Sequence, residues 1–191
     1  MLKTLPQTRD WSLAYRLGSI AAFTALTAVG ARVTVEIGPV PLTLQTLAVF
    51  LAGMTLGAKD GAWSQILYVG LIAVGLPLDA RGLGAGVFAG PTWGYLLGFI
   101  LCAYVTGYIT ERAGHRWWLR VFAALIGSLF VFIPGVIVLQ AMTQMPWREA
   151  FESGFLLFSP ENLAKAGLAA GIAEGTRALL LRAAPQTERG V

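Results

Sequence analysis

The chain has 191 residues, of which 56% are hydrophobic and 13% are charged. Soluble domains carry about 25% charged residues, so this composition excludes an ordinary soluble domain and predicts a membrane protein. The net charge of +4 would suit a nucleic-acid partner in a more polar chain. In a chain this apolar we interpret the charge as a signal of membrane orientation, and we expect no nucleic-acid partner.

Apolar stretches separated by clusters of charge predict six transmembrane helices, because about 20 apolar residues span the hydrocarbon core of a bilayer. The expected helices cover about 13–31, 42–58, 61–76, 91–112, 117–141 and 160–182. We therefore predict an all-α membrane protein, with six transmembrane helices in one compact bundle and a single membrane domain over 1–191. The mixed, polar stretch before the first helix does not resemble a cleavable signal peptide.

The distribution of Lys and Arg predicts the orientation of this bundle. With six crossings both termini share one side, and that side holds ten of the 14 basic residues: Lys3, Arg9, Arg16, Lys59, Arg112, Arg116, Arg120, Arg177, Arg182 and Arg189. The other side holds Arg32, Arg81, Arg148 and Lys165. The positive-inside rule therefore places both termini in the cytoplasm.

The outer loops are the longer ones, and they are unusual in composition. Residues 32–41, 77–90 and 142–159 are rich in Gly or Pro and in apolar residues rather than simply polar. Such loops suggest a structured lid over a binding site, with ordinary connectors as the alternative. The inner connection at 58–61 is expected to be a tight turn.

Several kinds of chemistry are missing from the sequence. It contains no phosphate-binding loop, no zinc-protease motif, no nucleophile elbow and no pair of carboxylates within an apolar segment. Cys102 and His115 are the only cysteine and the only histidine, so no disulfide and no His/Cys metal site are expected. We predict that the protein is not an enzyme and has no metal or cofactor, and we interpret Cys102 as a packing residue.

Polar and aromatic groups instead gather where three of the expected helices begin, on the outer side. Together with one outer loop they supply Thr43, Gln45, Asp79, Arg81, Thr92, Trp93, Tyr95, Asn162 and Lys165. A mostly apolar cavity with a few placed polar groups is typical of a small-molecule site. Individually the groups have other interpretations: Thr92 as a helix cap, Gln45 bonded to a neighbouring helix, and Asp79 paired with Arg81.

Lys165 is the most unusual of these residues. It lies about 9 Å into a helix that Ser159 is expected to cap and Pro160 to begin, and it precedes an uncharged run. A charge deep in a membrane helix costs about 2.5–3.5 kcal/mol, which marks a candidate functional residue. Lys165 could equally snorkel to the surface, or pair with Glu161 four residues earlier.

Small residues recur every four positions, as in Gly53 and Gly57, in Gly90, Gly94 and Gly98, and in Gly167, Gly171 and Gly175. Such spacing lets membrane helices approach closely, and we expect it to serve packing within the bundle. The first helix is the exception. Its stripe of Gly18, Ala21, Ala22 and Ala25 could receive a helix of another protein.

The sequence resembles a known family in three places. The motifs are Pro39-Val40-Pro41-Leu42-Thr43-Leu44-Gln45-Thr46-Leu47, Gly90-Pro91-Thr92-Trp93-Gly94-Tyr95-Leu96-Leu97-Gly98-Phe99, and the helix start from Pro160 to Lys165. They are similar to those of BioY-type proteins, the biotin-specific substrate-capture (S) subunits of energy-coupling-factor (ECF) vitamin transporters. The resemblance implies a six-helix subunit of the bacterial plasma (inner) membrane that binds biotin from outside.

The resemblance also implies partners, namely a transmembrane coupling subunit and two ATPase subunits, although some BioY proteins are thought to work without them, as oligomers. The pair Ala21 and Ala25 is similar to the motif that docks such subunits on the coupling protein. Lys165 matches the family's lysine, whereas Asn162 stands where the family more often has aspartate.

Biotin's chemistry suits the candidate residues. Its ureido ring could meet Asn162, Lys165 and Gln45, its sulfur ring could rest on Tyr95 or Trp93, and its carboxylate could meet Arg81. Two other functions stay open from the residues: capture of a different small vitamin, and a structural or assembly role in the membrane without a ligand. A membrane enzyme is disfavoured because no catalytic constellation is present.

Overall fold

A computed structural model describes residues 12–113 and 116–183. Its elements in chain order are α1 (Leu13–Arg32), β1 (Thr34–Glu36), β2 (Pro41–Thr43), α2 (Gln45–Ala73), the 3₁₀ helix η2 (Gly84–Ala89), α3 (Trp93–Ala113), α4 (Trp117–Thr143), α5 (Trp147–Gly154), the 3₁₀ helix η3 (Leu156–Phe158) and α6 (Ser159–Ala183). Lys3, Arg9, His115, Arg189 and the side chain of Arg182 lie outside the described part. The orientation that rests partly on them stays a prediction.

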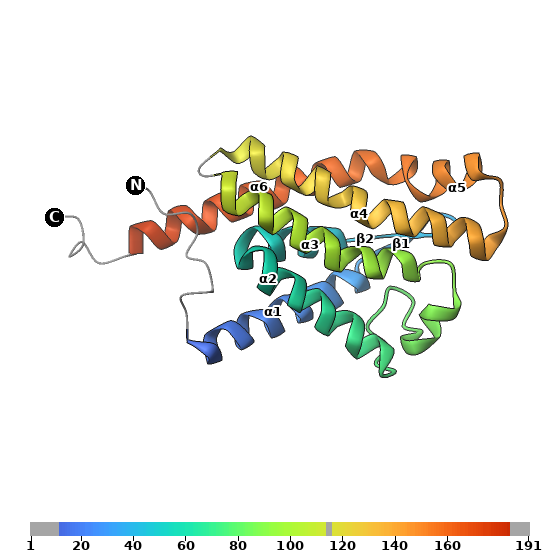
Figure 1. Ribbon diagram of the computed structural model, residues 1–191, viewed down its shortest axis with the longest axis horizontal. Helices are drawn as coiled ribbons and strands as arrows, with labels where there is room; N and C mark the ends of the chain where they lie inside the picture. The colour runs from blue at the N-terminus through green and yellow to red at the C-terminus, as the bar shows by residue number, and fades with distance from the viewer. Residues whose placement is uncertain (1–11, 114–115, 184–191) are drawn as a thin grey trace.

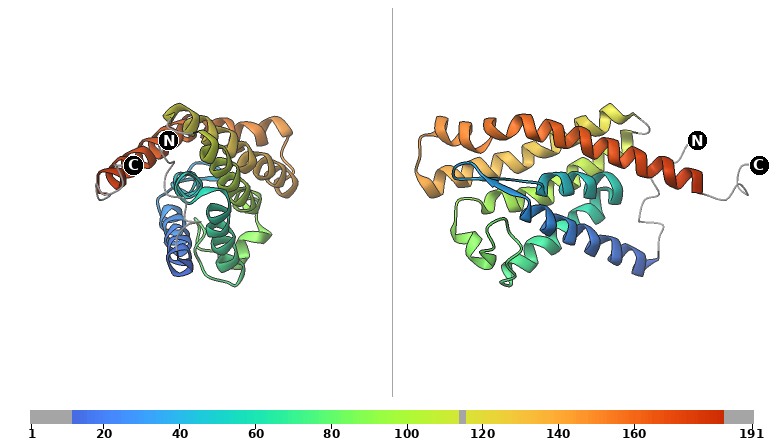
Figure 2. Two further views of the ribbon diagram at one scale, coloured as in Figure 1. Left: turned by 60° about the vertical axis from the view of Figure 1, so that its left-hand side comes forward. Right: turned by 180° about the vertical axis from the view of Figure 1, so that it is seen from behind.

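The long helices form one bundle, in which α2 packs against α1, α3 and α6, and α4 packs against α3 and α6. In Figure 1 the start of α1 and the end of α6 lie at one end of this bundle. The β1–β2 hairpin, η2 and α5 lie toward the other end, as the view from behind in Figure 2 also shows. The outer loops are thus structured, as predicted, and they gather at one end of the molecule.

Two of the predicted helices, 42–58 and 61–76, form the single element α2, which is broken at Gly57. Gly57 has φ 82° and ψ −176°, a conformation that essentially only glycine adopts. The chain folds back there, so that a Cβ at Gly61 would lie 3.0 Å from the carbonyl oxygen of Ala52 (Figure 1). A tight reversal is present, as predicted, but its predicted position is wrong: residues 58–61 are helical, and the non-helical residue is Gly57.

A side chain from α3 binds the backbone directly after this break. The carboxylate of Glu111 accepts a hydrogen bond of 2.8 Å from the backbone N–H of Ala58. The first N–H groups of a helix have no partner within it, so Glu111 caps the second half of α2 from a neighbouring helix.

Helix starts differ from the prediction where local rules compete. Residues 41–43 form strand β2, in which Thr43 pairs with Thr34 and Pro41 with Glu36, so α2 begins at Gln45. Pro41 has no N–H to donate and suits a strand of this short, edge-only sheet. Ser159 does not cap α6: it has helical backbone angles, and its hydroxyl donates to the carbonyl of Phe155 at 3.0 Å.

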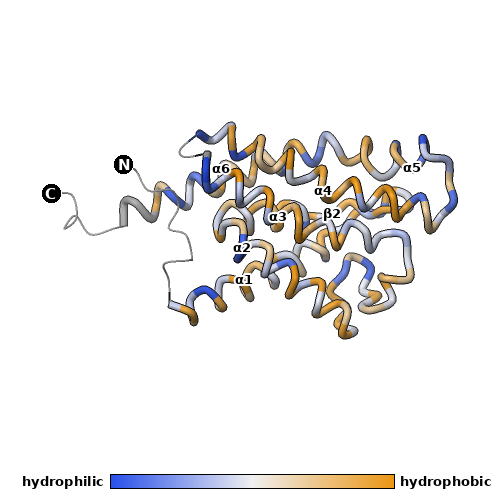
Figure 3. The backbone as a smooth tube through the Cα atoms, in the orientation of Figure 1, coloured by the Kyte–Doolittle hydropathy of each residue, from blue (hydrophilic) through white to orange (hydrophobic). Residues whose placement is uncertain are grey.

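The helices carry apolar residues along their middles and polar ones mainly near their ends and in the loops (Figure 3). Among the described residues, three helices are long and apolar enough to cross a membrane: α1, the Trp93–Arg112 part of α3, and α4. Large apolar side chains are also exposed around the bundle, including Leu17, Val29, Ile133 and Leu168. This surface fits contact with lipid rather than with water.

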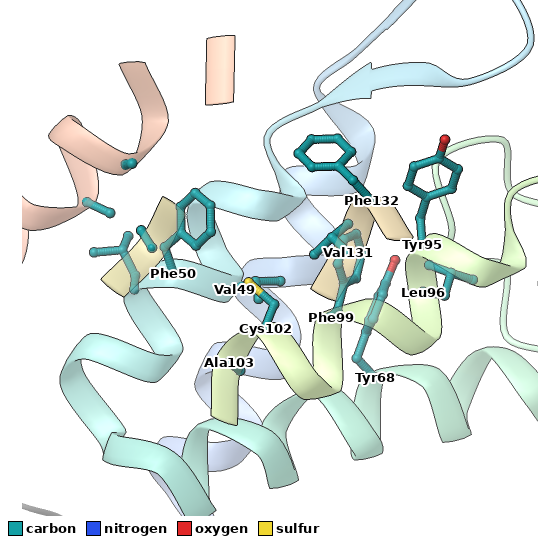
Figure 4. Packing of buried hydrophobic residues seen from close by; sticks show 14 of the residues in the cluster. Val49, Phe50, Tyr68, Tyr95, Leu96, Phe99, Cys102, Ala103, Val131 and Phe132 are labelled. Atoms are coloured by element: carbon teal, nitrogen blue, oxygen red, sulfur yellow. The ribbon is translucent and has the colours of Figure 1, made fainter. Parts of the chain in front are cut away.

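Side chains from α2, α3, α4 and α6 meet in the core, and Figure 4 shows ten of them by name. Cys102 is fully buried in this cluster, as its interpretation as a packing residue requires. Glycines allow the close contacts, because a Cβ at Gly94 would collide with the carbonyl of Pro134 on α4. The glycines at 167, 171 and 175 differ, since a Cβ at each would meet nothing within 4 Å. For those three the prediction of packing within the bundle is wrong.

Substituting Gly57 tests the break in α2. Gly57→Ala should lower the free energy of unfolding by about 1–3 kcal/mol, because the backbone conformation excludes a side chain. The new Cβ would also collide with Glu111 Oε1. Thermal unfolding of the purified protein in detergent measures the change.

Gly70→Ala is the matched control within the same helix. A Cβ at Gly70 meets nothing within 4 Å and its backbone is helical, so alanine should leave stability unchanged or raise it by up to about 1 kcal/mol. Equal effects of the two substitutions would contradict a special role of Gly57.

Candidate ligand-binding cavity

A cavity opens inside the bundle at the end that carries the hairpin, η2 and α5. The empty space at this site is about 680 Å³, a volume that includes the part open to solvent. Its apolar lining consists of Val40, Pro41, Ala80, Leu83, Val87, Leu96, Phe99, Val131, Phe132 and Phe158, and its polar lining of Thr43, Gln45, Thr46, Asp79, Arg81, Thr92, Tyr95 and Glu161. The composition is that of a small-molecule site, and the residues come from segments far apart in the chain.

Aromatic side chains form one wall. Phe132 of α4 meets Phe155 edge-on, with ring centroids 5.1 Å apart, and lies 6.3 Å from the ring of Phe158. The hydroxyl of Tyr95 donates to the carbonyl of Gly154 at 3.0 Å, which ties α3 to the end of α5. Figure 4 shows Tyr95 near Phe132, on the side of the cluster away from Phe50. The wall is thus held in place before any ligand arrives.

Gln45 is held by neighbours at both ends of its amide. Its Nε2 donates to the Tyr68 hydroxyl at 2.7 Å, and its Oε1 accepts from the Thr43 hydroxyl at 2.9 Å. Tyr68 in turn donates to the carbonyl of Leu78 at 2.9 Å. Tyr68 lies in the half of α2 after Gly57, which was predicted as the separate helix 61–76, so the interpretation of Gln45 as bonded to a neighbouring helix is confirmed. The hydroxyl of Thr46, which also lines the cavity, is buried without a hydrogen-bond partner in the described part of the chain.

Asp79 and Arg81 both line the cavity, but they have different side-chain partners. The Asp79 carboxylate accepts from the backbone N–H groups of Gly84 at 2.7 Å and Arg81 at 3.1 Å, which shapes the loop before η2. The Arg81 guanidinium lies 2.8 Å from Glu36 in the hairpin and donates to the carbonyl of Pro39 at 3.2 Å. Hydrogen bonding to Arg81 holds the pKa of the exposed Glu36 carboxyl below its usual range. The suggested side-chain pairing of Asp79 with Arg81 is replaced by a link between this loop and the hairpin.

Lys165 is buried, with 6% of its surface exposed. Its ammonium lies 2.6 Å from the Glu161 carboxylate and donates to the carbonyl of Thr43, so pairing with Glu161 is the confirmed alternative. Asn162 is equally buried at 4% exposed, and its Oδ1 has no hydrogen-bond partner among the described residues. Neither residue lines the cavity directly; both adjoin Glu161, which does.

The structure thus brings together six of the nine predicted site residues: Thr43, Gln45, Asp79, Arg81, Thr92 and Tyr95. Trp93 does not line the cavity, because its neighbours Thr92 and Tyr95 occupy that side of the start of α3. The sequence analysis missed Thr46, Glu161 and the three phenylalanines of the lining, Phe99, Phe132 and Phe158. Thr46 directly follows Gln45 and could have been noticed, whereas the phenylalanines look like any core residue until the helices are assembled.

Comparison with known proteins identifies the family. Residues 4–182 match the model of the BioY family. The chain belongs to the BioY family. Among its relatives, the biotin transporter BioY of Thermotoga maritima is 42% identical over 79% of this chain and 89% of its own length. The probable biotin transporter BioY of Pyrococcus horikoshii is 38% identical over 81% of this chain and 91% of its own length.

The fold matches a solved structure as well. The crystal structure of the S-component for biotin from an ECF-type ABC transporter aligns with a TM-score of 0.80 and 28% identity, covering 86% of this chain and 91% of that one. With relatives that are named transporters, the predictions of a membrane-embedded protein and of a protein that is not an enzyme are confirmed.

Two neighbouring side chains test the hydrogen bonds around the cavity. Gln45→Leu should lower the free energy of unfolding by about 1–3 kcal/mol, because the hydroxyls of Thr43 and Tyr68 each lose the Gln45 amide as a hydrogen-bond partner. Thr46→Val removes a hydroxyl that has no hydrogen-bond partner in the described part of the chain, so stability should stay the same or rise. Thermal unfolding without ligand compares the two, and an equal loss in both would refute the difference seen in their hydrogen bonding.

Proposed function

We propose that this chain is a biotin-capture subunit of an ECF-type transporter, which binds biotin in the cavity on the extracytoplasmic side for uptake across the bacterial inner membrane. The observation that carries the proposal is the cavity itself. Its walls are apolar and aromatic, and its few polar groups lie at one end of a bundle similar to a biotin S-component.

Each part of biotin has a counterpart at this site. The apolar sulfur ring packs against Tyr95, Phe99 and Phe132, all of which line the cavity. The carboxylate approaches Arg81, which lines the cavity where its loop is linked to the hairpin through Glu36. The ureido ring, with two N–H donors and one carbonyl, is assigned to the start of α6, beside Glu161, where Asn162 Oδ1 has no hydrogen-bond partner among the described residues and Lys165 is a donor.

The remaining candidate residues have supporting roles. Gln45 and Thr43 form the polar floor, and Thr92 adds a hydroxyl at the start of α3. Asp79 is occupied by two backbone N–H groups, so it shapes the loop rather than meeting the ligand. Trp93 does not line the cavity, and the ring contact is therefore assigned to Tyr95.

The proposed topology has six crossing segments and both termini in the cytoplasm. The segments are α1, the two halves of α2, α3, α4 and α6. This places the hairpin, η2 and α5 outside, over the cavity, where Arg81 and Glu36 link two of the covering segments at 2.8 Å. The excess of Lys and Arg on the opposite side supports this orientation.

Transport requires partners, because the sequence carries no ATP-binding motif. We assign the stripe of Gly18, Ala21, Ala22 and Ala25 on α1 to docking on a transmembrane coupling subunit, which two ATPase subunits drive. All four residues are exposed, and a Cβ at Gly18 would meet nothing within 4 Å. Small residues let a second helix approach closely in a membrane. Oligomers of this chain are the alternative arrangement.

Removing the Lys165 ammonium tests the site. Lys165→Ala should abolish biotin binding and uptake without loss of membrane insertion, because it leaves Glu161, which lines the cavity, without its buried partner. Titration of the purified protein with labelled biotin measures binding. Lys59→Ala removes an exposed lysine at the far end of the bundle and should bind biotin normally. Undiminished binding in Lys165→Ala would refute the role assigned to Lys165.

Filling the α1 stripe tests docking separately from binding. Ala21→Leu with Ala25→Leu should prevent co-purification with the coupling subunit and the ATPases, since larger side chains hold a partner helix away. Biotin affinity of the isolated subunit should not change, because the stripe is remote from the cavity lining. Normal co-purification of this variant would exclude the stripe as the docking surface.

A second candidate function is capture of another small vitamin. It is favoured by Asn162, which is uncharged where the resemblance leads us to expect aspartate. Mass spectrometry of the ligand that co-purifies with the protein separates the two candidates. A structural or assembly role predicts no tight small-molecule binding at all. Tight binding in the biotin titration would therefore exclude that role.

A further inference from the structure

Two carboxylates line the cavity, and they differ in what they already bind. Asp79 is 2% exposed, and its oxygens accept from the backbone N–H groups of Gly84 and Arg81. The Glu161 side chain is 31% exposed, and Lys165 is its one side-chain partner among the described residues. A carboxylate has about four lone-pair sites, so Glu161 has more acceptor capacity left for a ligand than Asp79, and it is also the more exposed of the two.

Lys165 lies behind this carboxylate. Its ammonium has three N–H donors, and Glu161 and the carbonyl of Thr43 occupy two of them. A buried charge is tolerated only when it is paired, and the 2.6 Å contact with Glu161 provides that pairing. The cavity therefore meets the carboxylate of Glu161 rather than a bare cation, because Glu161 lines the cavity and Lys165 does not.

The next residue adds a second acceptor. Asn162 is 4% exposed, and its Oδ1 has no hydrogen-bond partner in the described part of the chain. The first turn of α6 thus carries a carboxylate with free lone pairs beside an unpaired amide oxygen. A ligand group that donates N–H bonds complements this turn, whereas a ligand carboxylate would be repelled by Glu161.

We propose that Glu161 is a specificity-determining residue, which accepts a hydrogen bond from a ring N–H of the ligand while it stays paired with Lys165. This inference rests on the proposed function, because the N–H donors are those of biotin's cyclic urea. A charge-assisted hydrogen bond is stronger than a neutral one, and a site built to accept an N–H discriminates against an analogue that lacks it.

The test compares two ligands on variants of the full chain in detergent. The ligands are biotin and the analogue in which two CH2 groups replace the two ring N–H groups. The wild-type protein should prefer biotin by tenfold or more, and Glu161→Leu should reduce that preference by at least about tenfold. Glu161→Gln keeps a neutral acceptor of the same size and should show an intermediate preference, which decides the matter if Glu161→Leu does not fold.

A matched control comes from α5. Glu152 also forms an ion pair four residues apart in a helix, with Arg148 at 2.8 Å, and it does not line the cavity. Glu152→Gln should leave the preference for biotin over the analogue unchanged. Because each variant is compared with the wild type for both ligands, effects that change the binding of both ligands equally cancel, such as a shift of the Lys165 ammonium.

Two outcomes would overturn the inference, and they are distinguishable. If the Glu161 variants weaken the binding of both ligands by the same factor, the preference for biotin over the analogue is unchanged, and Glu161 only holds Lys165 in place. The inference then fails while the proposed function stands. If the wild-type protein does not bind biotin, the proposed function fails, and the inference fails with it.

Discussion

The rest of the structure around the cavity depends on one buried ammonium. Lys165 cannot remain charged inside an apolar bundle without partners, and it finds them in Glu161 on its own helix and in the carbonyl of Thr43 at the end of β2. The contact joins the first and last parts of the chain, 122 residues apart. The contact lies where β2 gives way to α2, next to Gln45 and Thr46, which line the cavity.

Most polar groups around the cavity are already bonded within the protein. Gln45, Tyr68 and the carbonyl of Leu78 form one chain of hydrogen bonds, and Asp79 is held by two backbone N–H groups. The described groups left over include the Thr46 hydroxyl, the side-chain amide oxygen of Asn162 and the free lone pairs of Glu161. A rigid frame with a few open positions lowers the entropic cost of binding and gives selectivity for a matching ligand.

Ion pairs at the opposite end hold the helices together in pairs. Arg16 of α1 lies 2.7 Å from Asp60 of α2, and Arg120 of α4 lies 2.6 Å from Glu174 of α6. At the cavity end an ion pair between Arg81 and the more exposed Glu36 links the loop before η2 to the hairpin. Exposed pairs contribute little to stability, so this ion pair holds the hairpin and the loop less firmly than the more buried pairs hold the helices.

The sequence by itself determined the membrane class, the positions of most helices, the structured outer loops and six residues of the cavity lining. These follow from local properties, namely apolar length, Gly and Pro content, and polar groups at expected helix starts. Only the tertiary structure decided that Gly57 reverses the chain, that Arg81 pairs with the hairpin, and that Glu161 stands between Lys165 and the cavity. Each of these depends on residues distant in the chain or on a backbone conformation, and spacing along the sequence carries neither.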